Sequence, residues 1–277
     1  MVAPFPDRPS RFVESPDGTP IAMFSAGVGP ALVLVHGTTA DHRTWRVLGP
    51  MLVDRFAIHA IDRRGRGDSG DGGDPYSIAL ELDDMATVAD VLAGESGAAV
   101  DVLGHSLGGR IALGATLRTP SIRRVIAYES APSSVLRAPG ARDELLEALR
   151  GDLARADNDT LLARFMTEAV GMPAADLAAF RADPIWPLRA AAAPTIVREL
   201  DAADTAPEIS LESLSVVGVP VLQVAGSESP DSFREAASVL DARLVDGRLA
   251  IIDGARHAAH HSHPAELLAL VEDFLAR

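Results

Sequence analysis

The stretch VDVLGHSLG at residues 100–108 decides the fold of this chain. Its first half is a short apolar run, which predicts a buried strand, and the residues after it have the spacing of an amphipathic helix. Gly104 and Gly108 would let the chain turn sharply between the two elements. Ser106 would then stand exposed at the carboxyl end of the strand, beside the positive end of the helix dipole. This context is typical of a nucleophilic serine, whereas a serine that only caps the helix is the alternative.

The pattern around this turn predicts a layered α/β fold. Apolar runs rich in Val, Ile and Leu predict buried strands, and amphipathic segments between several of them predict helices. Such alternation favours a mostly parallel sheet with helices on both faces, here with an antiparallel hairpin at one edge. The predicted strands are residues 31–35, 56–61, 98–103, 124–128, 219–225 and 249–252, the helices 78–92, 107–117 and 264–275, and the hairpin strands 11–14 and 20–25.

The alternation stops between about residues 130 and 216. Helical patterns follow one another there, at 143–156 and 160–169, without a convincing strand between them. Prolines punctuate the rest of the segment into short helices. We therefore predict a helical cap at residues 133–215, inserted into a core made of residues 1–132 and 216–277.

Composition limits the class of protein. A chain of 277 residues can form one domain with an insertion, and a net charge of -14 disfavours nucleic acid and acidic membranes as partners. The absence of cysteine excludes disulfides and a cysteine nucleophile. No apolar stretch approaches the ~18 to 20 residues of a membrane span, and no secretory signal is evident. We expect a cytoplasmic protein that acts on a small molecule, while its oligomeric state stays open.

The strand-turn-helix context is one of four motifs that together resemble the α/β-hydrolase superfamily. The resemblance covers nearly the whole chain, and implies an eight-stranded sheet, a cap inserted after the sixth strand, and a catalytic triad in the order serine, acid, histidine. The four motifs are HGTT at residues 36–39, DRRGRGDS at 62–69, GHSLG at 104–108 and GARH at 254–257.

Two members of the predicted site follow directly from these motifs. Ser106 is the candidate nucleophile, and His257, in a loop after the last predicted strand, is the candidate general base. The N–H groups of Thr38 and Leu107 are the candidates for the oxyanion hole. His260, His261 and His263 compete with His257, and the same cluster could be interpreted as a metal site. We predict no metal, because no carboxylate or cysteine spacing supports one. His42, His59 and His105 are expected to be packing or surface histidines.

The acid of the triad is the most open assignment. The commonest pattern of the superfamily places an aspartate three residues after the glycine of the loop GSESPD at residues 226–231, but that position is Ser229. A minority of members take their acid from the end of the sixth strand, where Glu129 stands. We predict Glu129, with Glu228 and Asp231 as alternatives, and its role would be to orient the imidazole. A glutamate that only ties the cap to the sheet is the other interpretation.

The motifs predict hydrolysis of an ester, thioester, amide or lactone through an acyl-enzyme, with no metal or organic cofactor. A cofactor-free perhydrolase, a C–C bond hydrolase or a lyase would keep the same serine. A receptor that only binds a small ligand is the alternative of another class. Residues 65–70 also match a G-x-G-x-x-G dinucleotide motif, but they lie deep in the chain and no helix follows at once.

Overall fold

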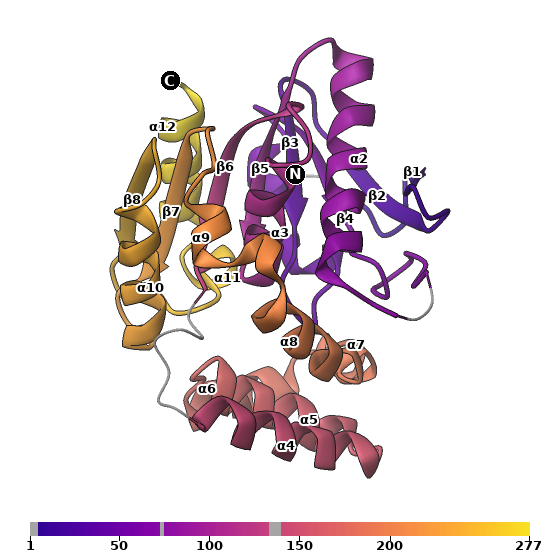
Figure 1. Cartoon of the computed structure of the whole chain (residues 1–277), viewed down its shortest axis with the longest axis vertical. Coiled ribbons are helices and arrows are strands. Elements are labelled where there is room, and N and C mark those ends of the chain that lie inside the picture. The colour runs from indigo at the N-terminus through magenta and orange to yellow at the C-terminus, as the bar shows by residue number, and fades with distance from the viewer. Residues whose placement is uncertain (1–4, 73–74, 133–139) are drawn as a thin grey trace.

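The computed structural model describes residues 5–72, 75–132 and 140–277. Eight strands form one sheet in the order β1-β2-β4-β3-β5-β6-β7-β8 (Figure 1). The neighbours of β2 are antiparallel to it, and the other neighbouring strands are parallel. The predicted eight-stranded, mostly parallel sheet is confirmed. The strands are β1 (Arg11–Glu14), β2 (Pro20–Ala26), β3 (Ala31–Val35), β4 (Ala57–Ile61), β5 (Val100–His105), β6 (Ile122–Tyr128), β7 (Val221–Gly226) and β8 (Gly247–Ile252).

Helices cover both faces of the sheet. Alternate residues of β3 point to opposite sides: Val33 and Val35 belong to one apolar cluster, and Leu32 and Leu34 to the other. Burial on both sides explains why the strands are apolar runs. Helices α2 (Ile78–Ser96), α3 (Leu107–Ala115) and α10 (Asp231–Asp241) pack on the first face, and η1 (His42–Trp45), α1 (Gly49–Leu52), α11 (Ala259–Ser262) and α12 (Pro264–Leu275) on the second.

A group of helices lies between β6 and β7 in the chain and gathers at one end of the sheet, with α8 leading back toward it (Figure 1). This group has its own apolar cluster, which includes Leu149, Phe165 and Trp186. Residue 133, the predicted start of the cap, lies outside the described residues. The elements are α4 (Ala141–Ala154), α5 (Asn158–Arg164), the π-helical turn η3 (Phe165–Ala169), α6 (Ala174–Ala182), α7 (Trp186–Ala192) and α8 (Thr195–Thr205).

Two short helices before β7 pack differently from the rest of this group. They are η4 (Pro207–Ile209) and α9 (Leu211–Leu214), and their Ile209 and Leu214 belong to the cluster on the first face of the sheet. The division into core and cap remains a prediction. Because η4 and α9 pack against the sheet, we propose that the cap ends before η4 and not at residue 215.

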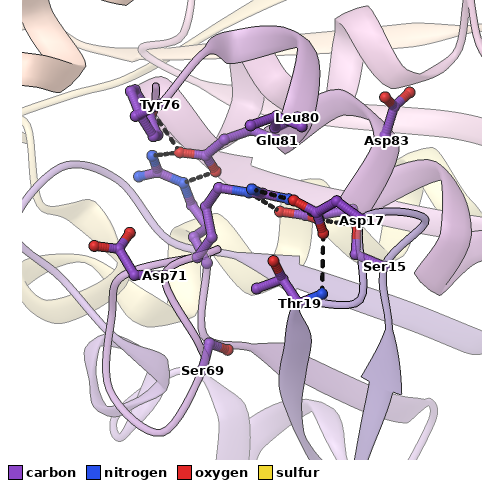
Figure 2. A network of polar contacts seen from close by, with 12 residues as sticks. Ser15, Asp17, Thr19, Ser69, Asp71, Tyr76, Leu80, Glu81 and Asp83 are labelled. Carbon is purple, nitrogen blue, oxygen red and sulfur yellow. Dashed lines mark hydrogen bonds and ion pairs between the residues drawn. The ribbon is translucent and has the colours of Figure 1, made fainter. Parts of the chain in front are cut away.

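Buried ion pairs fix the loop after β4 to α2 (Figure 2). Arg63 Nε donates to Glu81 at 2.8 Å, and Arg64 Nε donates to Asp84 at 2.7 Å. Tyr76 Oη also donates to Glu81, at 2.6 Å. Because the charges of Arg63 and Arg64 are paired with carboxylates of α2, we assign these two arginines a structural role. Among the described residues, no helix is long and apolar enough to cross a membrane.

Candidate active site

Ser106 occupies the sharp turn between β5 and α3. Its backbone has φ 54° and ψ -127°, a region that costs a non-glycine residue about 1–3 kcal/mol. The N–H of Ser106 donates to the carbonyl of Tyr128 at 2.9 Å, which holds the turn against β6. Position 108 must be glycine, because a Cβ there would lie 2.3 Å from the carbonyl oxygen of His36. The close approach of β3 to this turn therefore depends on the motif that the sequence showed.

Backbone strain is concentrated at this edge of the sheet. Four non-glycine residues of the described chain have positive φ, and three of them are Thr39, Ser106 and Glu129. They follow the ends of β3, β5 and β6, which are neighbouring parallel strands. Strain of this kind persists where the surrounding structure holds a residue in place, and it is common at active sites.

His257 and Glu129 are in direct contact. His257 lies in the loop after β8, and its Nδ1 is 2.6 Å from Oε2 of Glu129. The other carboxylate oxygen accepts from the N–H of Gly226 at 2.8 Å and from the hydroxyl of Ser229 at 2.5 Å. The carboxylate is buried and is held by groups from the end of β7 and the loop after it, and from the loop after β8. An Nδ1–H that donates to it leaves Nε2 of His257 as a proton acceptor.

The two alternative acids pair with arginines and not with His257. Glu228 forms a surface ion pair with Arg256 at 2.7 Å, and Asp231 pairs with Arg234. Both carboxylates are exposed, whereas that of Glu129 is not. Thus the structure brings Glu129 to His257 and does not bring Glu228 or Asp231 there.

The loop after β3 lies against the serine turn. A Cβ on Gly37 would be 2.9 Å from that of Ser106. His36 locks this loop, because its Nδ1 contacts the carbonyl of Gly37 at 2.9 Å and its Nε2 accepts from the N–H of Arg63 at 3.0 Å. Burial lowers the pKa of His36 well below its usual value, so the ring is neutral.

Both oxyanion-hole candidates line the same small cavity. This cavity has a volume of about 100 Å³, and Thr38, Ser106 and Leu107 all line it. The N–H of Leu107 opens helix α3, and such first-turn groups lack a partner inside the helix. Both N–H groups are therefore candidates to donate to an oxygen next to Ser106.

A second, larger cavity of about 450 Å³ also reaches Ser106 and His257. Side chains of η3 and α6, such as Phe165, Met166 and Phe180, give it an apolar wall. Since both cavities share Ser106, His257 and Thr38, a substrate can extend in two directions from the serine. Such space can accommodate an ester, because its acyl and alcohol parts lie on opposite sides of the reacting carbonyl.

Comparison with known proteins decides the family. Residues 32–270 match the alpha/beta hydrolase family. The chain belongs to this family. It is a hydrolase, as the sequence predicted.

Named relatives of this hydrolase include esterases. A pimeloyl-[acyl-carrier protein] methyl ester esterase of Neisseria meningitidis serogroup B (strain H44/76) is 31% identical over 253 residues, covering 87% of this chain and 91% of the relative. The protein of the same name from Edwardsiella ictaluri (strain 93-146) is 31% identical over 254 residues, covering 88% of this chain and 92% of the relative.

Solved structures share the fold. An alpha/beta hydrolase from Sphaerobacter thermophilus DSM 20745 superposes with a TM-score of 0.76 at 28% identity, over 93% of this chain and 100% of that chain. Esterase EaEST from Exiguobacterium antarcticum has a TM-score of 0.79 at 21% identity, over 96% of this chain and 99% of that chain. The latter likeness shows the fold alone.

Two other histidines of the hydrolase contact residues around the candidate site. His105 Nε2 contacts the carbonyl of His257 at 2.7 Å, and His260 Nε2 contacts the hydroxyl of Thr44 at 3.1 Å. Burial lowers the pKa of both His105 and His260 well below the usual value. His261 and His263 line the larger cavity without contacting Glu129. The sequence predicted that His105 is a packing or surface residue. It did not predict that His105 contacts the backbone of His257.

One group of metal-ligand side chains comes together among the described residues, formed by Asp41, His42 and Asp62. Asp62 Oδ1 accepts from the N–H of His42 at 2.7 Å and contacts its Nδ1 at 2.9 Å. Asp41 pairs with Arg43 at 2.7 Å. Because these oxygens already bind protein donors, the group fits a structural role.

Proposed function

We propose that this hydrolase cleaves carboxylic esters of small molecules through an acyl-enzyme on Ser106, with His257 as general base and Glu129 as the orienting acid. The observation that carries the proposal is the 2.6 Å contact of His257 Nδ1 with the buried carboxylate of Glu129, beside a cavity shared with Ser106. The ester class is supported by relatives that are named methyl ester esterases. Action inside the cytoplasm, expected from the sequence, belongs to the same proposal.

The reaction uses each group at a defined atom. Ser106 Oγ attacks the ester carbonyl carbon while Nε2 of His257 takes the hydroxyl proton. The N–H groups of Thr38 and Leu107 donate to the oxyanion. As the C–O bond breaks, His257 returns the proton to the leaving alcohol. Water then attacks the acyl group with His257 again as base, which releases the acid and regenerates Ser106.

Hydrolysis of a panel of methyl and p-nitrophenyl esters of increasing acyl length tests this proposal. The wild type should turn over part of the panel, and Ser106→Ala should lose about 10³-fold or more in kcat/KM. Ser238→Ala, an exposed serine on α10, is the matched control and should behave as wild type. A wild type that binds panel members but hydrolyses none would overturn the proposal and favour a binding protein. Full activity in Ser106→Ala would reject the nucleophile.

A further inference from the structure

Arg189 of helix α7 faces the larger cavity, which also contains Ser106. Its Nη1 donates to the hydroxyl of Thr39 at 3.4 Å, and its Nη2 to the hydroxyl of Thr44 at 3.1 Å. Its Nε is buried and has no hydrogen-bond partner among the described residues. Within that part of the chain, the guanidinium contacts neutral oxygens and forms no ion pair.

The acids near Arg189 already have other partners. Asp41 pairs with Arg43 at 2.7 Å, and Asp183 pairs with Arg46 at 3.0 Å. Burial lowers the pKa of Arg189 to about 10, so the side chain still carries its charge at neutral pH. The side chain is partly buried, and a charge that is partly taken out of water without a counter-ion is unfavourable, so an anion supplied by a ligand would offset that cost.

The surroundings indicate where such an anion would come from. Arg189 and Ser106 line one continuous cavity, and Phe165, Met166 and Phe180 make much of its wall apolar. A ligand that fills this cavity would meet these apolar side chains and, at Arg189, a positive charge. The planar guanidinium matches a carboxylate, which can accept two parallel hydrogen bonds. A single uncompensated positive charge matches one negative charge.

We propose that Arg189 forms a carboxylate subsite, so that the preferred ester carries a carboxylate at the far end of an apolar chain. This inference rests on the proposed esterase function and names its substrate class. Arg189 would fix the charged end, while Thr39 and Thr44 hold the guanidinium in place. The alternative role for Arg189 is structural, as a link between the cap and the two threonines.

The experiment compares charged esters with neutral esters of matched length. One series consists of monomethyl esters of α,ω-dicarboxylic acids, set against methyl alkanoates, and places the carboxylate on the acyl side. The other consists of acetate esters of ω-hydroxy acids, set against alkyl acetates, and places it on the alcohol side. Wild type, Arg189→Gln and Arg189→Lys are assayed. Arg150→Gln, an exposed arginine that pairs with Asp201 at 2.8 Å, controls for loss of one charge.

The wild type should prefer one charged series, with an optimum in chain length. Arg189→Gln should lose about 10- to 100-fold in kcat/KM on that series, mainly through KM, because a hydrogen bond to a charged group is lost. Its activity on neutral esters should change little, Arg189→Lys should retain part of the preference, and Arg150→Gln should retain all of it. Equal losses on charged and neutral esters, or no loss, would overturn the subsite. No hydrolysis of any ester by the wild type would instead overturn the proposed function.

Discussion

The hydroxyl of Ser229 donates to the carboxylate of Glu129, although the two residues are 100 positions apart in the chain. Ser229 stands where the commonest pattern of the family has its aspartate, and its hydroxyl donates to the acid that comes from β6 instead. The carboxylate beside His257 therefore belongs to a residue that follows β6 and not to the loop after β7. The N–H of Gly226 completes the set of donors around Glu129.

Glu129→Gln tests the orienting role of this carboxylate. An amide in this place can stabilise the wrong imidazole tautomer and carries no charge for the imidazolium, so kcat/KM should fall about 10³- to 10⁴-fold in ester hydrolysis. Glu228→Gln is the matched control and should change kcat/KM by less than about threefold, since its exposed pair with Arg256 contributes little. Equal losses in the two variants would contradict the assignment of Glu129.

The candidates Ser106 and His257 come from short motifs, because each follows a strand in a recognisable loop. Contacts between residues far apart in the chain could not be predicted in this way. The carbonyl of His257 accepts from His105, and Arg189 reaches Thr44 from α7, over separations of 152 and 145 residues. Nothing in the local pattern signals such pairs. The serine at position 229 was the local sign that led us to predict an acid outside this loop.

At the scale of elements, α8 is joined to the loops around the site through Glu199. Its carboxylate accepts from Arg66 at 2.5 Å and lies 3.2 Å from Arg63. Burial opposes its ionisation, but Arg63, Arg66 and a hydrogen bond from Thr38 outweigh burial and lower the pKa of Glu199. A helix of the predicted cap is thereby coupled to the loop that carries an oxyanion-hole candidate.

Glu199→Gln should destabilise the protein by about 3–5 kcal/mol, because two buried arginines lose their shared counter-charge. Asp201→Asn lies on the same helix and breaks only an exposed pair with Arg150, so its effect should stay within about 1 kcal/mol. Urea unfolding of both variants measures the difference. Similar free energies of unfolding for the two would show that the buried cluster adds no stability.

The first residues of two strands could not be predicted from the apolar pattern of the sequence. β6 begins at Ile122 and β8 at Gly247, each two residues before the predicted start. Arginines interrupt the apolar pattern at positions 123, 124 and 248, whereas the strands continue through them. Arg123 lies within β6 and donates to Asp101 of β5 at 2.9 Å, which gives a charged residue a place in the sheet.

At the scale of the whole molecule, the sheet class was predictable and the strand order was not. Apolar runs and alternating helices give a mostly parallel sheet, but β4 lies between β2 and β3. Pairing of this kind depends on contacts across the chain. The helices α4 to α7 at one end of the sheet fit the break in strand pattern that the sequence showed (Figure 1).

Stability of the whole molecule should fall on mild acidification. Burial lowers the pKa of His36, His105 and His260 well below that of an unfolded histidine, about 6.5. Below pH 6.5 the unfolded chain binds protons that the folded chain does not. Stability is therefore full above pH 6.5 and is lost as the pH falls toward the folded pKa values.

The free energy of unfolding should be lower at pH 5.5 than at pH 7.5 by about 1.4 kcal/mol for each of these histidines, or about 4 kcal/mol together. Burial also lowers the pKa of His59 to about 4, so this ring adds about another 1.4 kcal/mol to the difference, and His59→Gln should remove that part. Urea unfolding at the two pH values measures it. A protein equally stable at both would contradict the neutral state of the buried rings.

Covalent labelling of Ser106 tests the central claim most directly. The folded wild type is treated with a fluorophosphonate probe, and its intact mass and labelled peptides are measured by mass spectrometry. The account predicts one adduct per chain, located on Ser106, lost in Ser106→Ala and slowed strongly in Glu129→Gln. An unlabelled wild type, or an adduct on another residue, would contradict an activated serine at the turn between β5 and α3.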